Sequence, residues 1–399
     1  MADRRLRSLA SVAGIIALVY LTGRLVTTGF FALAAHLSGP TSRFGADATI
    51  GSLAMGWDGQ WYWYIAAAGY PAELPVSESG QVAENAWAFM PVYPFLAQSF
   101  GTVLGGYPAG AIIVSLAAGY AASVLLFVLL RPRIGAGAAL WAVVFFSNGP
   151  LAALFQMGYA EPLFLALLLA ALVLLTRRSF GWLYLLIPIM GFTRPGVLAF
   201  ALLLGLYGIM RWLRRRQDPL PTRQIVHIIA LGVLTTVVGF SWQVIAGIAT
   251  GDPASYLETE LAWRRAWVGA ETGFVPFSGF IEASGMWFEL WGMPRALGPV
   301  VLGLLVAAVA GALVWAPSVR GLGPEIRLWS ASYLVYLLAV FFPQSSLFRL
   351  LLPLTPVVGA VAAPPSRSWR IGVLAVCLLG QWWWIHEMLA LGDTYFRIP

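Results

Sequence analysis

Four charged side chains stand where they could do chemistry in an otherwise apolar chain. Asp58 lies in the stretch GWDGQWYWYIAAAGY, where a dense run of aromatic residues follows it. Glu161 precedes a proline in GYAEP, and Arg194 and Arg349 each lie close to a proline-containing turn. A positioned carboxylate can take the proton of a reacting hydroxyl, and the arginine fork binds phosphate oxygens in pairs. These residue types indicate chemistry on a substrate that carries phosphate.

Each of these residues also has a purely structural interpretation. Asp58 could do no more than cap a helix, because Asp is a good N-cap. Glu161 could simply begin a helix at the water boundary, since proline suits the first helical position. An arginine inside a membrane is costly unless it meets a partner or a wet cavity, and either arginine alone could reach headgroups or form a structural ion pair. Spacing alone leaves both interpretations open.

The composition requires that membrane-spanning elements hold these residues. The chain has 399 residues, of which 60% are hydrophobic and only 10% are charged, whereas soluble domains have about a quarter charged residues. Apolar runs of roughly 20 residues recur, which is the length of a membrane-crossing helix. Backbone in lipid must satisfy its own hydrogen bonds. We therefore expect an all-α polytopic membrane protein with a single domain over residues 1–399.

Arginine clusters between the apolar runs orient the chain, because positive residues near span ends mark the cytoplasmic side. Placing every cluster inside predicts a cytoplasmic N-terminus, an external C-terminus and about eleven spans: 8–33, 108–130, 135–152, 161–176, 181–193, 195–213, 224–248, 296–316, 328–343, 349–363 and 370–391. The first of these is expected to be retained and not removed as a signal peptide.

Two large loops, 37–107 and 249–295, face outside in this topology. Their many tryptophans predict interfacial helices on the outer leaflet, above all in the first loop. In the second loop, three acids, Glu258, Glu260 and Glu271, lie near an arginine pair, Arg264 and Arg265. We expect these acids to form solvated ion pairs on the loop surface.

Two short hairpins are predicted to carry an arginine at the tip. The stretch 181–213 begins and ends at cytoplasmic arginines, so it crosses twice and turns at Thr193–Gly196. Its first arm of about 13 residues is roughly 20 Å long, which is shorter than the bilayer core of about 30 Å. Arg194 should therefore lie below the outer surface, and the stretch 327–367 repeats the pattern with Arg349. Two such tips predict a shared extracytoplasmic cavity with a positive floor, suited to a lipid-linked phosphate.

Several stretches, in order, resemble PIG-V-type mannosyltransferases, a family of GT-C glycosyltransferases. They are Trp57-Asp58-Gly59-Gln60-Trp61-Tyr62, Phe89-Met90-Pro91-Val92-Tyr93-Pro94, Tyr159-Ala160-Glu161-Pro162-Leu163-Phe164 and Thr193-Arg194-Pro195-Gly196, with Arg349-Leu350-Leu351-Leu352-Pro353 in the last third. The resemblance covers roughly residues 50–200 well. The first stretch is fairly specific, and the others gain weight from their order. Met90 and Pro162 depart from the family pattern without touching the acids or arginines.

The resemblance implies a GT-C-like fold, an active site at the outer face and a polyprenyl-phosphate mannose donor. Asp58 would be the general base of an inverting displacement, and Arg194 and Arg349 would bind the donor phosphate. The implied substrate-positioning residues are Glu161, Trp57, Gln60, Trp61, Tyr62, Tyr93 and Tyr159. The compact, all-arginine chain resembles a bacterial member, so we expect the inner (plasma) membrane. The acceptor would be a glycolipid, a cell-envelope glycan or an exported protein.

Other functions stay open. A lipid or sugar transporter would also bury arginines in broken helices, and a non-catalytic scaffold could support another glycosyltransferase. No cofactor or metal is expected, because the single cysteine and three scattered histidines give no ligand spacing. The net charge of +7 is spread in short clusters and does not indicate a nucleic-acid partner.

Overall fold

A computed structural model describes residues 2–268, 273–394 and 397–399 of the chain. Five of its helices are long and apolar enough to cross a membrane, judged by length and composition. They are α1 (Ala2–Leu37), α5 (Tyr107–Ser147), α9 (Thr222–Thr250), α12 (Leu297–Trp315) and α17 (Arg367–Ile385). Shorter helices lie among them: α6 (Glu161–Thr176), α7 (Leu183–Gly191), α8 (Val197–Leu213), α14 (Pro324–Val340), α15 (Leu347–Leu350) and α16 (Val358–Ala362). This is the architecture of a multi-pass helical membrane protein, and the number of spans stays a prediction.

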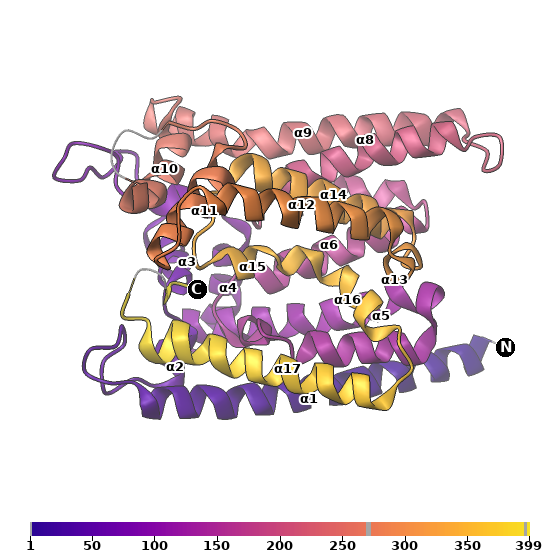
Figure 1. Ribbon diagram of the computed structural model, residues 1–399, viewed down its shortest axis with the longest axis horizontal. Coiled ribbons are helices and arrows are strands. Elements are labelled where there is room, and N and C mark those ends of the chain that lie inside the picture. Colours follow the sequence, from indigo (N-terminus) through magenta and orange to yellow (C-terminus); the bar gives the residue numbers. More distant parts are fainter. Residues whose placement is uncertain (1, 269–272, 395–396) are drawn as a thin grey trace.

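The long helices run side by side, with the two chain termini at opposite ends of the bundle (Figure 1). Both large loops lie at the end that carries the C-terminus. Their helices are α2 (Ile50–Ala54), α3 (Asp58–Ala68), α4 (Val92–Leu104), α10 (Ser255–Val268) and α11 (Ser278–Leu290). The opposite end carries the α8–α9 connection and α13 (Pro317–Arg320). The two loops thus share one end, as the topology requires, and the assignment of that end to the outer side remains a prediction.

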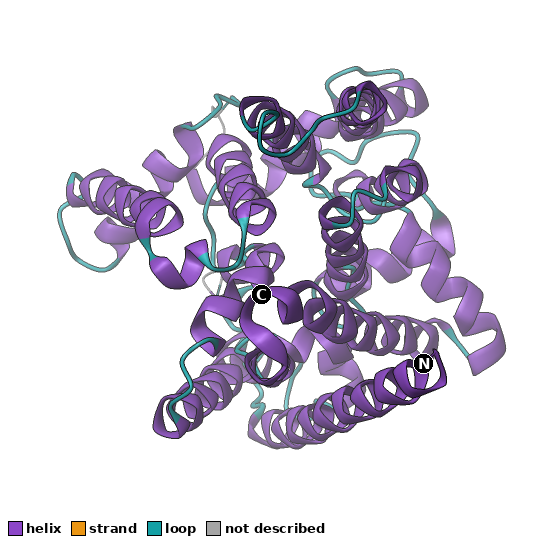
Figure 2. Ribbon diagram, turned by 90° about the vertical axis from the view of Figure 1, so that its right-hand side faces the viewer, coloured by secondary structure: helices purple, strands orange, loops and turns teal. Residues whose placement is uncertain are grey.

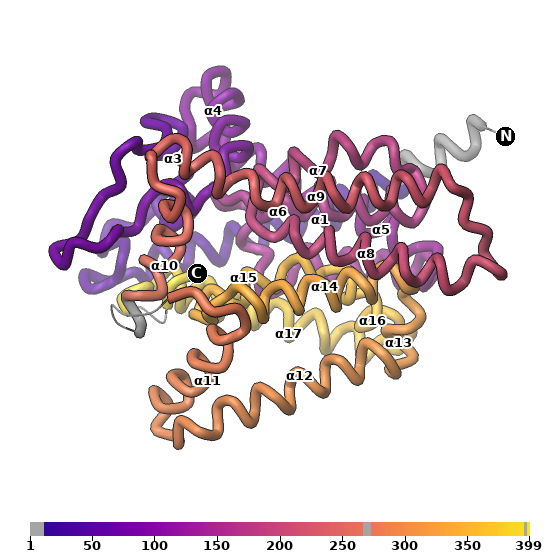
Figure 3. Tube along the Cα trace, turned by 90° about the horizontal axis from the view of Figure 1, so that it is seen from above, coloured from indigo at the N-terminus to yellow at the C-terminus, as the bar shows by residue number. Residues whose placement is uncertain are grey.

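Seen from the end that carries the N-terminus, the described residues form helices and connecting loops (Figure 2). Extended pairing among them is limited to one bridge, between Val76 and Val82 in the first loop. Helices α11 and α12 extend away from the rest of the bundle (Figure 3). Most side chains of α12 are exposed, which suits a helix that faces lipid on several sides.

Helix α5 consists of two helices joined at Gly135, whose φ of 80° and ψ of 162° are not helical. The sequence predicts a break between spans at this place, and the structure confirms it. Helix α1 contacts both halves, because the Tyr20 hydroxyl donates to the Leu116 carbonyl over 2.9 Å and Arg24 donates to the Ser147 carbonyl over 2.5 Å. Arg24 also donates to the carbonyl of Ala152. A buried guanidinium thus holds the chain where α5 ends.

Helix α4 packs on the beginning of α5 with the two backbones in contact. A Cβ atom placed on Gly110 would lie 2.1 Å from the carbonyl oxygen of Ala97, so only glycine fits there. The other side of α4 exposes large apolar side chains, among them Phe95, Phe100 and Val103. This amphipathic arrangement is typical of an interfacial helix, and α4 and α3 together cover the loop end of the bundle.

Candidate active site

Asp58 is the first residue of α3, and the backbone before it is strained. The N-cap residue Trp57 has φ 55° and ψ −122°, a conformation that is rare for any residue other than glycine. Two contacts hold it there: its indole N–H donates to the Met388 carbonyl over 3.1 Å, and its ring meets Phe44 edge-on. Asp58 is not the cap of this helix. Its carboxylate forms an ion pair with Arg349 of α15 instead.

The predicted acids and arginines meet in a single chain of ion pairs. Arg349 pairs with Asp58 and also lies 3.2 Å from Glu161, measured from Nη1 to Oε1. Glu161 pairs in turn with Arg194. Their side chains are between 3% and 20% exposed, and Asp58 is the most accessible of the four. Two arginines and two carboxylates have a net charge of zero. The floor of the predicted cavity, which is expected from the sequence to be positive, is therefore neutral in this structure.

The protein environment changes the acidity of Asp58. Burial raises the pKa of its carboxyl group, the neighbouring Arg349 guanidinium opposes the rise, and the carboxylate of Glu161 adds to it. The net direction is upward because desolvation is the largest effect, and it outweighs the lowering by the Arg349 and Arg194 guanidinium groups. A carboxylate with a raised pKa is a better proton acceptor. The environment of Asp58 thus suits a base.

The turn that carries Arg194 has the predicted form. Helix α7 ends at Gly191 and α8 begins at Val197, with Arg194 between them. Gly196 has φ 124°, a conformation that the turn requires and that glycine adopts without strain. Arg349 follows the second predicted turn, Pro343–Ser346, and lies within the four-residue helix α15. The two tips are brought together through Glu161, although the sequence shows no link between them.

Three predicted tyrosines differ in what they can contact. Tyr159 is fully buried, and the Arg349 guanidinium lies over its ring at 5.3 Å. Tyr93 is fully buried between α4 and α5, where its hydroxyl donates to the Ala111 carbonyl over 3.0 Å. The Tyr62 ring meets Tyr93 edge-on at 5.1 Å. Tyr62 and Tyr93 therefore pack α3 against α4 with both side chains buried.

The second loop contributes an acid, Glu260, whose partner is not the one predicted from the sequence. Arg265 pairs with the expected Glu258 at 3.0 Å, but the Arg265 side chain is only 10% exposed, so the prediction of a solvated pair is wrong. Arg264 pairs with Glu282 instead. Glu271 lies outside the described residues. Glu260 instead accepts a hydrogen bond from Tyr256, one turn earlier on α10, and interacts electrostatically with Arg194. Desolvation raises the pKa of Glu260 to about 7, although part of its side chain still reaches solvent. The spacing of four between the tyrosine and the acid is the signal that could have found it.

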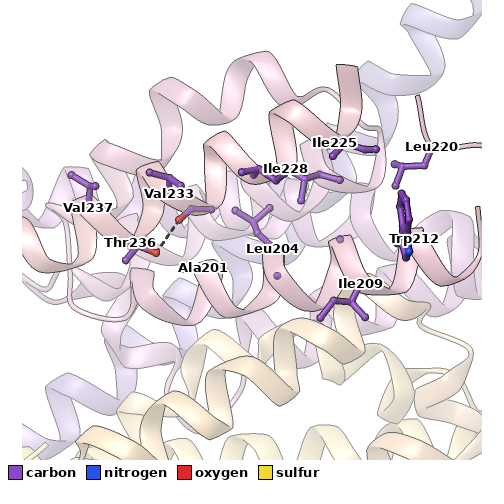
Figure 4. A pocket seen from close by; sticks show the side chains of 14 residues that line it. Ala201, Leu204, Ile209, Trp212, Leu220, Ile225, Ile228, Val233, Thr236 and Val237 are labelled. Carbon is purple, nitrogen blue, oxygen red and sulfur yellow. Dashed lines mark hydrogen bonds between the residues drawn. The ribbon is translucent and has the colours of Figure 1, made fainter. Parts of the chain in front are cut away.

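Gln60 is exposed and Trp61 is half-buried on α3. They line a groove of about 680 Å³ on the loop end of the protein. A second groove of about 660 Å³ runs between α8 and α9 (Figure 4). Its lining is apolar, and the hydroxyl of Thr236 is used by its own helix, at the Gly232 carbonyl. That second groove offers apolar contact only, as expected of a lipid-facing surface.

Among the described residues, no three His, Cys, Asp or Glu side chains group so as to hold a metal ion. The expectation that no metal takes part stays a prediction.

Comparisons with known proteins give only distant likenesses. No family model and no curated protein matches the sequence. The fold is similar to the crystal structure of ArnT from Cupriavidus metallidurans in the apo state, with a TM-score of 0.46, 16% identity and coverage of 87% of this chain and 58% of that one. It is similar to ArnT of the same organism bound to undecaprenyl phosphate, with a TM-score of 0.45, 16% identity and coverage of 86% and 59%. This chain therefore spans about three fifths of the length of ArnT, and likenesses at this level assign it no function.

Proposed function

We propose that the chain is a GT-C glycosyltransferase that transfers mannose from polyprenyl-phosphate mannose to an acceptor hydroxyl at the extracytoplasmic face. The observation that carries the proposal is the chain of ion pairs. Each of its four members comes from a different stretch that resembles the PIG-V-type mannosyltransferases. Residues so distant in sequence have no reason to meet in a neutral, partly accessible cluster unless that cluster has a use.

Asp58 acts as the base of a direct displacement. The acceptor oxygen forms a bond to the anomeric carbon of the donor, and the bond from that carbon to the phosphate oxygen breaks. The hydroxyl proton passes to the Asp58 carboxylate, and the bonding electrons leave with the polyprenyl phosphate. Attack from the face opposite the phosphate inverts the anomeric configuration. Asp58 suits this role because it is the most accessible member of the cluster.

Arg349 and Arg194 stabilise the leaving group. The donor phosphodiester carries one negative charge and gains a second as the carbon–oxygen bond breaks. Fixed guanidinium groups stabilise charge that develops in this way. Arg349 is paired with Asp58 before the donor binds, so a phosphate that takes the place of the carboxylate also frees Asp58 to act as a base. Glu161 keeps contact with both arginines and orients them.

Transfer of labelled mannose tests the proposal directly. Purified protein in lipid nanodiscs is given radiolabelled polyprenyl-phosphate mannose and membrane-derived acceptors, and the product is separated from the donor. We expect mannose transfer by the wild type, none by Asp58→Asn, and normal transfer by Asp47→Asn, which changes an exposed acid of the same loop. Donor binding without any transfer would instead favour a transporter, and neither binding nor transfer would favour a scaffold.

A further inference from the structure

The groove beside α3 has the size and lining of a small-molecule site. Its volume of about 680 Å³ falls within the range of about 300–1,000 Å³ of ligand pockets. Its walls come from separate segments of the first loop and from the beginning of α5. The lining residues are Arg43, Phe44, Ser52, Met55, Gln60, Trp61, Trp63, Tyr64, Glu84 and Pro108.

Aromatic contacts hold the walls in place. Trp61 stacks on Phe89 with ring centres 5.8 Å apart and an interplanar angle of 18°, and it meets Trp263 edge-on at 6.0 Å. The Arg43 backbone N–H donates to the Leu391 carbonyl over 3.1 Å, and its guanidinium lies over the ring of Trp57 at 4.9 Å. A site whose side chains are held before the ligand arrives loses less entropy on binding.

The polar groups of the groove suit a neutral, hydroxyl-rich ligand. One base, Arg43, and one acid, Glu84, give the lining zero net charge. An anionic headgroup would meet the repulsion of Glu84 and a single arginine. A hydroxyl group can both donate and accept a hydrogen bond. It can therefore donate to the Glu84 carboxylate, accept from the Arg43 guanidinium, and do either with the Gln60 amide. The flat aromatic rings offer broad apolar contact to the C–H faces of a sugar ring.

The groove also lies next to the proposed base. Asp58 and Trp61 are three residues apart on α3, which places them on neighbouring positions of one helix side. Glu84 lies within electrostatic reach of Asp58, because burial and the Asp58 carboxylate both raise the pKa of Glu84. A ligand in the groove can therefore present a hydroxyl towards Asp58, while the arginines lie on the bundle side of the same residue.

We propose that the groove lined by Arg43, Gln60, Trp61, Tyr64 and Glu84 binds the acceptor, and that the acceptor presents a neutral hexopyranose ring to it. This inference rests on the proposed function, because only a transferase has an acceptor. Binding of the sugar itself does not require catalysis. The sugar can belong to a membrane glycolipid or to a soluble glycan, since both present the same ring.

Binding of simple sugars to the full chain tests the groove. The protein is placed in nanodiscs that contain no glycolipid, and binding of methyl α-D-mannopyranoside, octyl α-D-mannopyranoside and glycerol 1-phosphate is measured by calorimetry and saturation-transfer NMR. We expect both mannosides to bind and glycerol phosphate not to bind. Tighter binding of the octyl compound would point to a glycolipid, and equal binding to a soluble glycan. Preferential binding of glycerol phosphate would overturn the proposal in favour of a phospholipid headgroup.

Variants locate the binding. Glu84→Gln and Gln60→Ala change exposed side chains, and each should weaken mannoside binding about tenfold, the loss expected of one hydrogen bond to a charged or polar partner. Glu73→Gln changes an exposed acid of the same loop outside the groove, and it should leave mannoside binding unchanged. Equal binding by all variants would overturn the inference.

The transfer assay separates this inference from the proposed function. If the wild type transfers mannose and the groove variants keep the wild-type KM for the acceptor, the function stands and the groove assignment fails. If the sugars bind in the groove and no variant of the protein transfers mannose, the binding site stands and the function fails.

Discussion

The Arg349 guanidinium is paired with the Asp58 carboxylate, although 291 positions separate the two residues in the chain. Each neutralises the other in a cluster whose charges sum to zero. The pair therefore competes with anything that binds either residue. A donor phosphate at Arg349 and a proton on Asp58 are both expected to open it.

This competition predicts opposite effects of two substitutions on donor binding. Asp58→Asn removes the competitor of the phosphate, so the Kd for the donor should fall or stay the same while turnover drops by about 10²–10⁴-fold, the usual contribution of a general base. Arg349→Lys keeps a positive charge but loses the two-pronged contact, so the Kd should rise. Donor binding by calorimetry and single-turnover transfer measure the two effects. Normal turnover by Asp58→Asn would refute the assignment of the base.

Glu161 is predicted to stabilise the fold because it balances two buried arginines. Its side chain is 3% exposed, and it contacts both Arg194 and Arg349. Removing one partner of a buried pair costs about 3–5 kcal/mol, so Glu161→Ala should lower the Tm markedly. The double variant Glu161→Ala/Arg194→Met should lose less than the sum of its single changes, since it also removes an unpaired charge.

The exposed pair of Glu289 and Arg295 is the matched control. Its side chains are more than 60% exposed and lie 3.2 Å apart. Glu289→Ala should change stability by no more than about 1 kcal/mol. Equal losses of Tm for Glu161→Ala and Glu289→Ala would mean that the cluster contributes nothing special to stability.

The sequence predicts the turns of this site better than its contacts. The stretch 181–213 lies between two arginine clusters assigned to the same side of the membrane, so it must cross an even number of times. This requirement and the position of Pro195 predict the turn at Arg194, which the structure confirms between Gly191 and Val197. Both features are local. The charge pattern likewise predicts that the two large loops lie at one end of the bundle.

The pairings depend on packing, which sequence spacing does not encode. Nothing near Asp58 indicates that Arg349 lies opposite it. Nothing near Glu260 indicates that it interacts electrostatically with Arg194. Arg24 is a similar case, because its partners are the carbonyls of Ser147 and Ala152. Every residue has a backbone carbonyl, so the sequence does not reveal which of them accepts a hydrogen bond from Arg24.

The raised pKa of Glu260 predicts that donor binding depends on pH. Its pKa of about 7 means that the carboxyl is mostly neutral at pH 6 and mostly ionised at pH 8. The ionised form interacts with Arg194 and competes with the donor phosphate, whose own charge does not change in this range. The donor should therefore bind more tightly at pH 6 than at pH 8. Calorimetric Kd values across this range measure the effect.

Two glutamate variants on α10 isolate this effect. Glu260→Gln should hold donor binding near its pH 6 value throughout. Glu258→Gln should keep the wild-type dependence, because Glu258 pairs with Arg265. A wild-type slope that survives in Glu260→Gln would show that another group titrates.

The close contact of α4 with α5 at Gly110 predicts that a larger residue at this position destabilises the protein. A Cβ at this position would meet the Ala97 carbonyl oxygen at 2.1 Å and the Gly101 nitrogen at 2.5 Å, and backbone atoms cannot rotate away. Overpacking costs typically about 1–3 kcal/mol where side chains can adjust, so Gly110→Ala should cost at least as much as the upper part of that range. We expect a large fall in Tm, measured in detergent.

Gly137→Ala is the control in the second half of α5, two residues after the break at Gly135, because a Cβ at that position meets no atom within 4 Å. Alanine is a better helix former than glycine, so this variant should be as stable as the wild type or more stable. The contrast tests the contact between the helices and not the helix propensity of α5. Helix α4 supports α3 through the contact between Tyr93 and Tyr62. Gly110→Ala should therefore also reduce mannose transfer by the protein that stays folded. Full activity of that folded protein would show that α3 keeps Asp58 in place without α4.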